Sequence, residues 1–146
     1  MIVTKYLMKL KLQQSKFNLM GIDLGTAFTG FSVSYNLQQV LVYDLHYSPC
    51  YSPHDSTLYK RIIQIINKEK IGGILIGKPS FEKGYIEEFT KGLESNLVAE
   101  GLKTYITHVG EDYTTKQAKK ISKTNNKFLH DGMAAMLILQ SFLNEL

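Results

Sequence analysis

The 146-residue chain has little of what disulfide-bonded, membrane-spanning or zinc-binding proteins contain. Its one cysteine, Cys50, excludes an internal disulfide and fits a reducing compartment. Its four histidines lack the spacing of zinc ligands, and no cysteine cluster joins them. The longest apolar runs, such as Gly72 to Gly77, are far too short to cross a bilayer. Arginine occurs once, at Arg61, so lysine supplies almost all of the positive charge.

The composition that is present, 44% hydrophobic and 21% charged, is that of an ordinary globular protein, and 146 residues are enough for a single domain with a buried core. The net charge is +4, and four lysines precede Asp23, the first acidic residue, while the thirteen later basic side chains balance thirteen acidic ones. We therefore predict an N-terminal extension over residues 1–16, flexible or used for targeting, and a single domain over residues 17–146. The expected location is the cytoplasm, or a mitochondrion or plastid if residues 1–16 are a targeting segment.

The order of periodic segments predicts an α/β fold. Three strands, at residues 17–24, 30–35 and 40–47, read as an antiparallel meander. A helix capped by Asp55 or Ser56 follows, and then come a strand at 73–76, a helix at 85–100, a strand at 103–109, a helix at 114–122 and a final helix opened by Asp131. This order predicts a mixed five-stranded sheet, in which the meander is followed by parallel βαβ crossovers, with helices on both faces.

Three acidic residues are the candidate catalytic and metal-binding groups. Ligands gather beyond the carboxyl ends of parallel strands, which points to Asp23 in its apolar strand and to Glu111 just past the fifth strand. Asp131, at the expected start of the last helix, can pack against the same edge. Three converging carboxylates repel one another unless cations such as Mg²⁺ or Mn²⁺ join them, and two such ions can cut a phosphodiester bond. A turn-capping Asp23, a solvated Glu111 and a plain N-cap at Asp131 remain open alternatives.

Lysines cluster between Asp112 and Asp131, where no acidic residue occurs. Lysines beside a proposed site suit contact with phosphates, although a merely solvated helix explains them equally well. The residues expected to contact nucleic acid are Thr26, Lys78, Lys83, Thr114, Lys116, Lys119, Lys120 and Lys123.

Three segments together resemble the YqgF/RuvX family, whose members are called Holliday junction resolvases or pre-16S rRNA nucleases. These segments are Met20 to Thr26 with Gly30, then Ile74 to Pro79, and then Asp131 to Ser141, which is close to the family's Asp-x-x-Ala-Ala-x-x-Ile-Leu-Gln ending. Val109 to Thr115 occupies the place of the family's Asp-Glu-Arg-x-Thr-Ser segment. The order and spacing agree from Phe17 to the C-terminus.

The resemblance implies an RNase H-like fold and carries the family's acidic roles onto Asp23, Glu111 and Asp131. It implies a metal-dependent endonuclease, a monomer or homodimer with no membrane partner, acting on structured nucleic acid. The favoured substrate is structured RNA, with processing of the 5′ end of pre-16S-type ribosomal RNA. The alternative is branched DNA, cut by a dimeric Holliday junction resolvase.

Some family positions are occupied by other residues. Ala27 and Phe28 stand where the family usually has a basic pair, and Gly110 and Asp112 replace the neighbours of its central Glu. A nucleic-acid-binding module with weakened catalysis is therefore a further hypothesis. An actin-like phosphotransferase is disfavoured, because such enzymes need two domains of this kind around the nucleotide.

Overall fold

Five strands form one sheet in the computed structural model of the chain. Their bounds are β1 (Asn18–Asp23), β2 (Phe28–Tyr35), β3 (Gln39–Tyr47), β4 (Ile71–Lys78) and β5 (Tyr105–Gly110). The strand order is β3-β2-β1-β4-β5, with β1, β2 and β3 antiparallel and β1, β4 and β5 parallel. The predicted mixed sheet, a meander followed by parallel crossovers, is confirmed. Strands β4 and β5 extend further toward Lys78 and Gly110 than the sequence pattern indicated.

The structure describes residues 1–25, 27–48, 52–79, 84–110 and 127–146, and only the backbone of residues 127–131. The helix expected at 114–122 lies outside these ranges. Within them, no helix combines the length and the apolar character that crossing a membrane requires.

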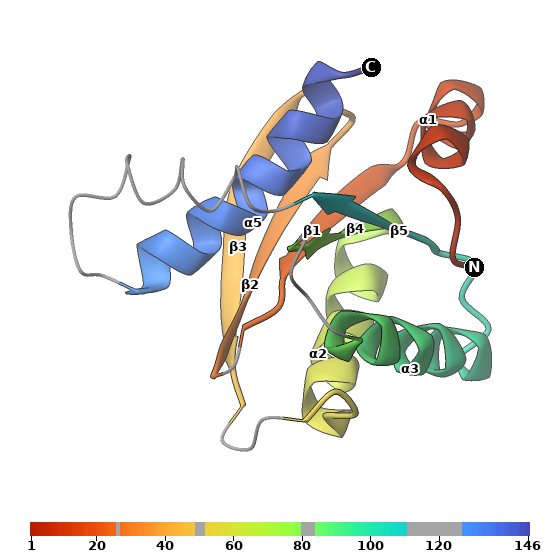
Figure 1. The fold of residues 1–146 in the computed structure, drawn as a ribbon. Coiled ribbons are helices and arrows are strands. Elements are labelled where there is room, and N and C mark those ends of the chain that lie inside the picture. Colours follow the sequence, from red (N-terminus) through yellow and green to blue (C-terminus); the bar gives the residue numbers. More distant parts are fainter. Residues whose placement is uncertain (26, 49–51, 80–83, 111–126) are drawn as a thin grey trace.

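Helices cover both faces of the sheet. Helices α2 (Ser56–Glu69) and α3 (Tyr85–Ala99) lie on one face, and α1 (Lys5–Gln14) and α5 (Lys127–Asn144) lie on the other (Figure 1). Helix α2 begins at the predicted cap, because the Asp55 carboxylate accepts hydrogen bonds from the backbone N–H groups of Thr57 and Leu58. Helix α3 ends before Gly101, because the φ of 69° at this glycine is left-handed and does not fit a right-handed helix.

Strand alternation divides the apolar side chains between two cores. On β1, Met20 and Ile22 enter the core beneath α2 and α3, and Leu19 enters the core beneath α1 and α5. On β4, Ile74 and Ile76 belong to the first core and Leu75 to the second. Alternate residues of each central strand therefore face opposite helical layers.

Residues 1–16, expected as an extension, are partly built into the second core. Met8 and Leu12 of α1 are buried there against the sheet. The backbone N–H of Val3 donates to the Ile106 carbonyl at 2.7 Å, which attaches the chain's first residues to the β5 edge. Thr4 caps α1 by accepting from the Leu7 backbone N–H.

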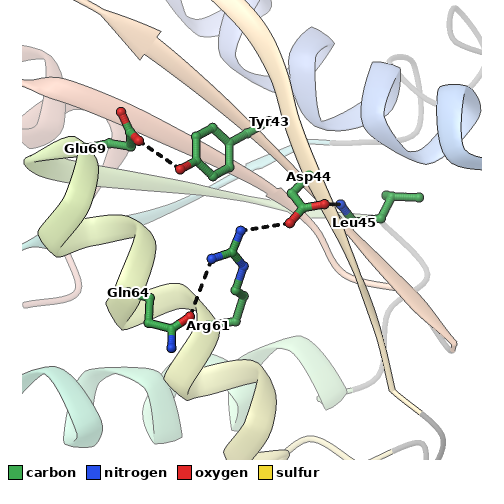
Figure 2. A network of polar contacts seen from close by, with 6 residues as sticks. All are labelled: Tyr43, Asp44, Leu45, Arg61, Gln64 and Glu69. Carbon is green, nitrogen blue, oxygen red and sulfur yellow. Dashed lines mark hydrogen bonds and ion pairs between the residues drawn. The ribbon is translucent and has the colours of Figure 1, made fainter.

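A polar network connects α2 to β3 on the other face of the sheet. The guanidinium of Arg61 donates to Asp44 Oδ2 at 2.8 Å, and the hydroxyl of Tyr43 donates to Glu69 at 2.8 Å (Figure 2). The pairing of β2 with β3 is irregular between Phe31 and Ser32, so Tyr43 and Asp44 both reach toward α2. The only arginine therefore joins a helix to an edge strand.

The prediction that Asp131 opens the last helix is wrong. Helix α5 begins at Lys127, which places Asp131 in its second turn. An N-cap role for Asp131 is excluded by this position, because a cap residue lies just outside the helix. Asp131 is therefore carried on regular helix.

Candidate active site

Asp23 is the last residue of β1, at the edge of the sheet where the parallel strands end. It pairs with Gly30 of β2 and is partly buried. Because Met20 and Ile22 face α2 and α3, the period of two places Asp23 on the opposite face, with Leu19 and Gly21. That is the face covered by α5.

The other parallel strands end at the same level. Ile22 of β1 is in register with Ile76 of β4, which is in register with His108 of β5. The last residue of β5 is Gly110, paired with Lys78. Glu111 is the next residue in the chain and lies outside the described residues, so its predicted role as a ligand stays a prediction.

Helix α5 comes very close to the sheet near Asp23. A Cβ on Gly21 would lie 2.6 Å from the Ala135 carbonyl oxygen, so only a glycine fits there without displacing the helix. Asp131 precedes Ala135 by one helical turn and stands on the same side of α5. Asp131 therefore lies on the helix that faces the Asp23 side of β1, and its side chain is outside the described residues.

Lys78, a predicted nucleic-acid contact, is already paired with an acid. Its Nζ lies 2.6 Å from Oε1 of Glu87 on α3. The hydrogen bond from Lys78, aided by its charge, lowers the pKa of the Glu87 carboxyl. This pair extends from the α3 face, whereas Asp23 belongs to the α5 face. The other predicted contacts, namely Thr26, Lys83, Thr114, Lys116, Lys119, Lys120 and Lys123, lie outside the described residues.

The donor atoms that the sequence offers at this edge suit a hard cation. Carboxylate oxygens are the ligands that Mg²⁺ and Mn²⁺ prefer. Among the described side chains, no three His, Cys, Asp or Glu residues group closely enough to hold a metal ion. Of the three predicted ligands, only Asp23 has a described side chain, so the metal site is not tested by the geometry.

Sequence reasoning missed two polar contacts near this edge. Ser32 of β2 donates from Oγ to the Ala135 carbonyl at 2.6 Å, and His108 Nε2 lies 2.8 Å from Thr90 Oγ1 on α3. Gly21, inside an apolar strand, was an available signal for the first contact, because such a glycine often marks a close approach of another backbone.

Solved structures support the fold. The chain is similar to the structure titled "T. thermophilus RuvC in complex with Holliday junction substrate", with a TM-score of 0.52 and 12% identity, covering 88% of this chain and 95% of that one. It is also similar to a Fowlpox virus resolvase solved with Holliday junction DNA, with a TM-score of 0.54 and 12% identity, covering 88% of this chain and 97% of that one. At this identity the likeness shows the RNase H-like fold alone.

Sequence relatives point to a family. Two bacterial proteins carry the name "Putative pre-16S rRNA nuclease". The one from Malacoplasma penetrans is 27% identical over 90% of this chain and 97% of its own length. The one from Dictyoglomus turgidum is 28% identical over 88% of this chain and 94% of its own length. The family model described as "RuvX: Holliday junction resolvase" matches residues 17–145, and this chain therefore belongs to the RuvX family.

Proposed function

We propose that this protein is a divalent-metal-dependent endonuclease that cuts structured nucleic acid, with the 5′ end of pre-16S-type ribosomal RNA as its main substrate. One observation supports this best. Asp23 ends β1 on the face of the sheet that α5 covers. Helix α5 packs on that face at Ala135, one helical turn after Asp131. Membership of a nuclease family agrees with this placement.

The chain's own residues supply ligands and position them. Asp23 from β1, Asp131 from α5 and Glu111 after β5 would hold Mg²⁺ or Mn²⁺ by carboxylate oxygens. When bound, the ions supply Lewis-acid stabilisation of the cleaved phosphate and lower the pKa of attacking water. Without cations the carboxylates repel one another, so we expect metal binding to relieve a repulsion built into the edge.

RNA is favoured over branched DNA because the two bacterial relatives described above are named for pre-16S rRNA. The family description favours a second candidate, resolution of Holliday junctions. Junction resolution needs two symmetric active sites, so it requires a homodimer. RNA trimming has no such requirement, and its expected location is the cytoplasm, or an organelle if residues 1–16 direct the chain there.

The test is cleavage of an RNA that carries the 5′ leader of 16S rRNA, with and without Mg²⁺ or Mn²⁺. We expect metal-dependent cleavage, and Asp23→Asn should reduce it by about 100-fold or more because a ligand is lost. Asp44→Asn is the matched control, since Asp44 pairs with Arg61 on the α2 side of the sheet. It should cleave like the wild type.

Two results would contradict the proposal. One is equal cleavage by the wild type and Asp23→Asn, and the other is no cleavage of RNA or of a four-way DNA junction at any metal concentration. Metal-dependent cleavage of the junction alone, by a protein that sediments as a dimer, would identify the second candidate.

A further inference from the structure

A buried hydrogen bond joins the sheet to α5 close to the proposed site. The hydroxyl of Ser32 on β2 donates to the backbone carbonyl of Ala135 at 2.6 Å, and both residues have no exposed surface. A carbonyl oxygen has two lone pairs, so Ala135 can accept this bond in addition to its bond within the helix. The sheet therefore binds the helix at one defined point.

Neighbouring glycines let the helix come close enough for this bond. A Cβ on Gly21 would lie 2.5 Å from Ser32 Oγ and 2.6 Å from the Ala135 oxygen. On the helix, a Cβ on Gly132 would lie 2.6 Å from Val42 Cγ1 of β3. Since real Cβ atoms do not approach so closely, both glycines are required for the observed separation of α5 from the sheet.

The bond lies between two elements that carry predicted ligands. Asp23 follows Gly21 by two residues on the same face of β1, and Asp131 precedes Ala135 by one turn on α5. A helix moves as a rigid element over one turn, because its backbone bonds join successive turns. A shift of α5 at Ala135 is therefore passed on to Asp131 and changes its place relative to Asp23.

We propose that Ser32 is a positioning residue, which fixes α5 against β1 so that Asp131 and Asp23 can share a metal ion. The proposal rests on the function proposed above, because it assigns those two acids to one site. Ser32 itself touches neither the metal nor the substrate. Its hydroxyl acts through the Ala135 carbonyl, and Gly21 leaves the room that this bond needs.

Ser34 provides a matched control on the same strand. It is also fully buried and stands on the same face of β2 as Ser32. Its hydroxyl has no hydrogen-bond partner among the described residues. Ser32→Ala and Ser34→Ala thus remove the same atom from similar surroundings, but only the first removes a bond to α5.

The experiment measures Mn²⁺ binding by calorimetry and the Mn²⁺ dependence of RNA cleavage for the full chain. We expect Ser32→Ala to weaken Mn²⁺ affinity by about tenfold, the lower end of the loss seen when a residue that orients a ligand is removed. The KM for RNA at saturating Mn²⁺ should stay within about twofold, since phosphate contacts are kept. Ser34→Ala should match the wild type in both measurements.

Equal Mn²⁺ affinity for the wild type, Ser32→Ala and Ser34→Ala, each shown to be folded by circular dichroism, would overturn the proposal. Gly21→Ala gives a second measurement that keeps the hydroxyl but forces α5 away, and it should also weaken Mn²⁺ binding. If Ser32→Ala does not stay folded, Ser32→Cys, which nearly keeps the side-chain volume but is a weak donor, takes its place and should show the same loss of Mn²⁺ affinity. Failure of the proposed function is seen separately, as Mn²⁺ binding and cleavage that survive Asp23→Asn.

Discussion

Glu69 accepts hydrogen bonds from two tyrosines at the end of α2. The hydroxyls of Tyr35 and Tyr43 lie 2.8 Å from its two carboxylate oxygens, one on each. These two bonds lower the pKa of the Glu69 carboxyl. Burial, followed by the bond to Glu69, raises the pKa of Tyr35 from 10.0 to about 12. The network therefore favours ionised Glu69 and neutral tyrosines.

This network predicts how stability changes with pH. The pKa of Glu69 is lowered on folding, so its stabilisation is present above the ordinary value of 4.5 and is lost as the pH falls through the folded value. The pKa of Tyr35 is raised, so its stabilisation is present below 10.0 and is lost as the pH rises toward about 12. Replacing both tyrosines by phenylalanine should cost about 1–2 kcal/mol at pH 7.

Urea unfolding at a series of pH values measures this effect. The difference between the wild type and the Tyr35→Phe/Tyr43→Phe variant should be largest near neutral pH and shrink below pH 4.5 and above pH 10. Tyr6→Phe is the control, because Tyr6 is exposed on α1. A constant difference from acid to alkaline pH would contradict the prediction, because it would show that the two hydroxyls contribute independently of the charge on Glu69.

Asp23 shows how far the sequence predicts a site residue. A carboxylate at the end of an apolar strand, next to a turn, predicted that Asp23 lies at this edge of the sheet, and β1 does end there, while its role as a metal ligand stays a prediction. The face of the sheet also follows from alternation with Met20 and Ile22. The pairing of Lys78 with Glu87 did not follow, because strand β4 and helix α3 meet only in the folded chain.

At the scale of elements, α5 depends on close packing as much as on helix propensity. Gly132 is a poor helix former, and alanine there would normally gain about 1 kcal/mol. Its Cβ would lie 2.6 Å from Val42 Cγ1, however, and crowding of this kind costs about 1–3 kcal/mol. The packing of α5 against β3 therefore favours glycine over the better helix former.

We predict that Gly132→Ala lowers the free energy of unfolding by about 1 kcal/mol, and that Val42→Ala relieves this loss. The loss in free energy of unfolding in the double variant should be smaller than the sum of the two single losses by about 1 kcal/mol, measured by urea denaturation. Val40→Ala with Gly132→Ala is the control pair, since the three atoms nearest to the new Cβ all belong to Val42 and none to Val40. Additive losses in both pairs would contradict the crowding argument.

Helix α1 was present in the sequence pattern and was not identified. Thr4 is a typical N-cap residue, and Met8 and Leu12 follow at the helical spacing of four. The lysines of residues 1–16, with no acidic residue among them, favoured a flexible or targeting segment instead. Lys5 and Lys9 in fact pair with Glu145 at 3.0 Å or less, beside the end of α5. Only the fold shows that these charges have a partner.

At the scale of the whole molecule, one sheet separates two cores and connects them. Leu12 of α1 is buried in the core with α5, and Leu93 of α3 is buried in the core with α2. Residues 1–16 lie outside the region matched by the family model, yet Leu12 is 1% exposed. The N-terminal helix therefore contributes to the same folded unit as residues 17–145.

We predict that Leu12→Ala and Leu93→Ala each lower the free energy of unfolding by about 2–5 kcal/mol, because each leaves a cavity in a packed core. Fluorescence and circular dichroism should give the same midpoint in urea for each variant, as expected for one cooperative unit. Val98→Ala, at an exposed position of α3, should change the midpoint little. A separate early transition in Leu12→Ala would show that α1 unfolds independently.

The sequence alone determined the sheet, its connections and Asp23 at its edge. Strand alternation, helical spacing and turn residues are local, so they can be read along the chain, and the family resemblance agreed with them. Tertiary structure alone decided that α5 begins before Asp131, that Lys78 pairs with Glu87, and that Ser32 holds α5 at Ala135. Each of these depends on which distant segments pack together, because a side chain's partner is set by the shape and burial of the surfaces that fold against it.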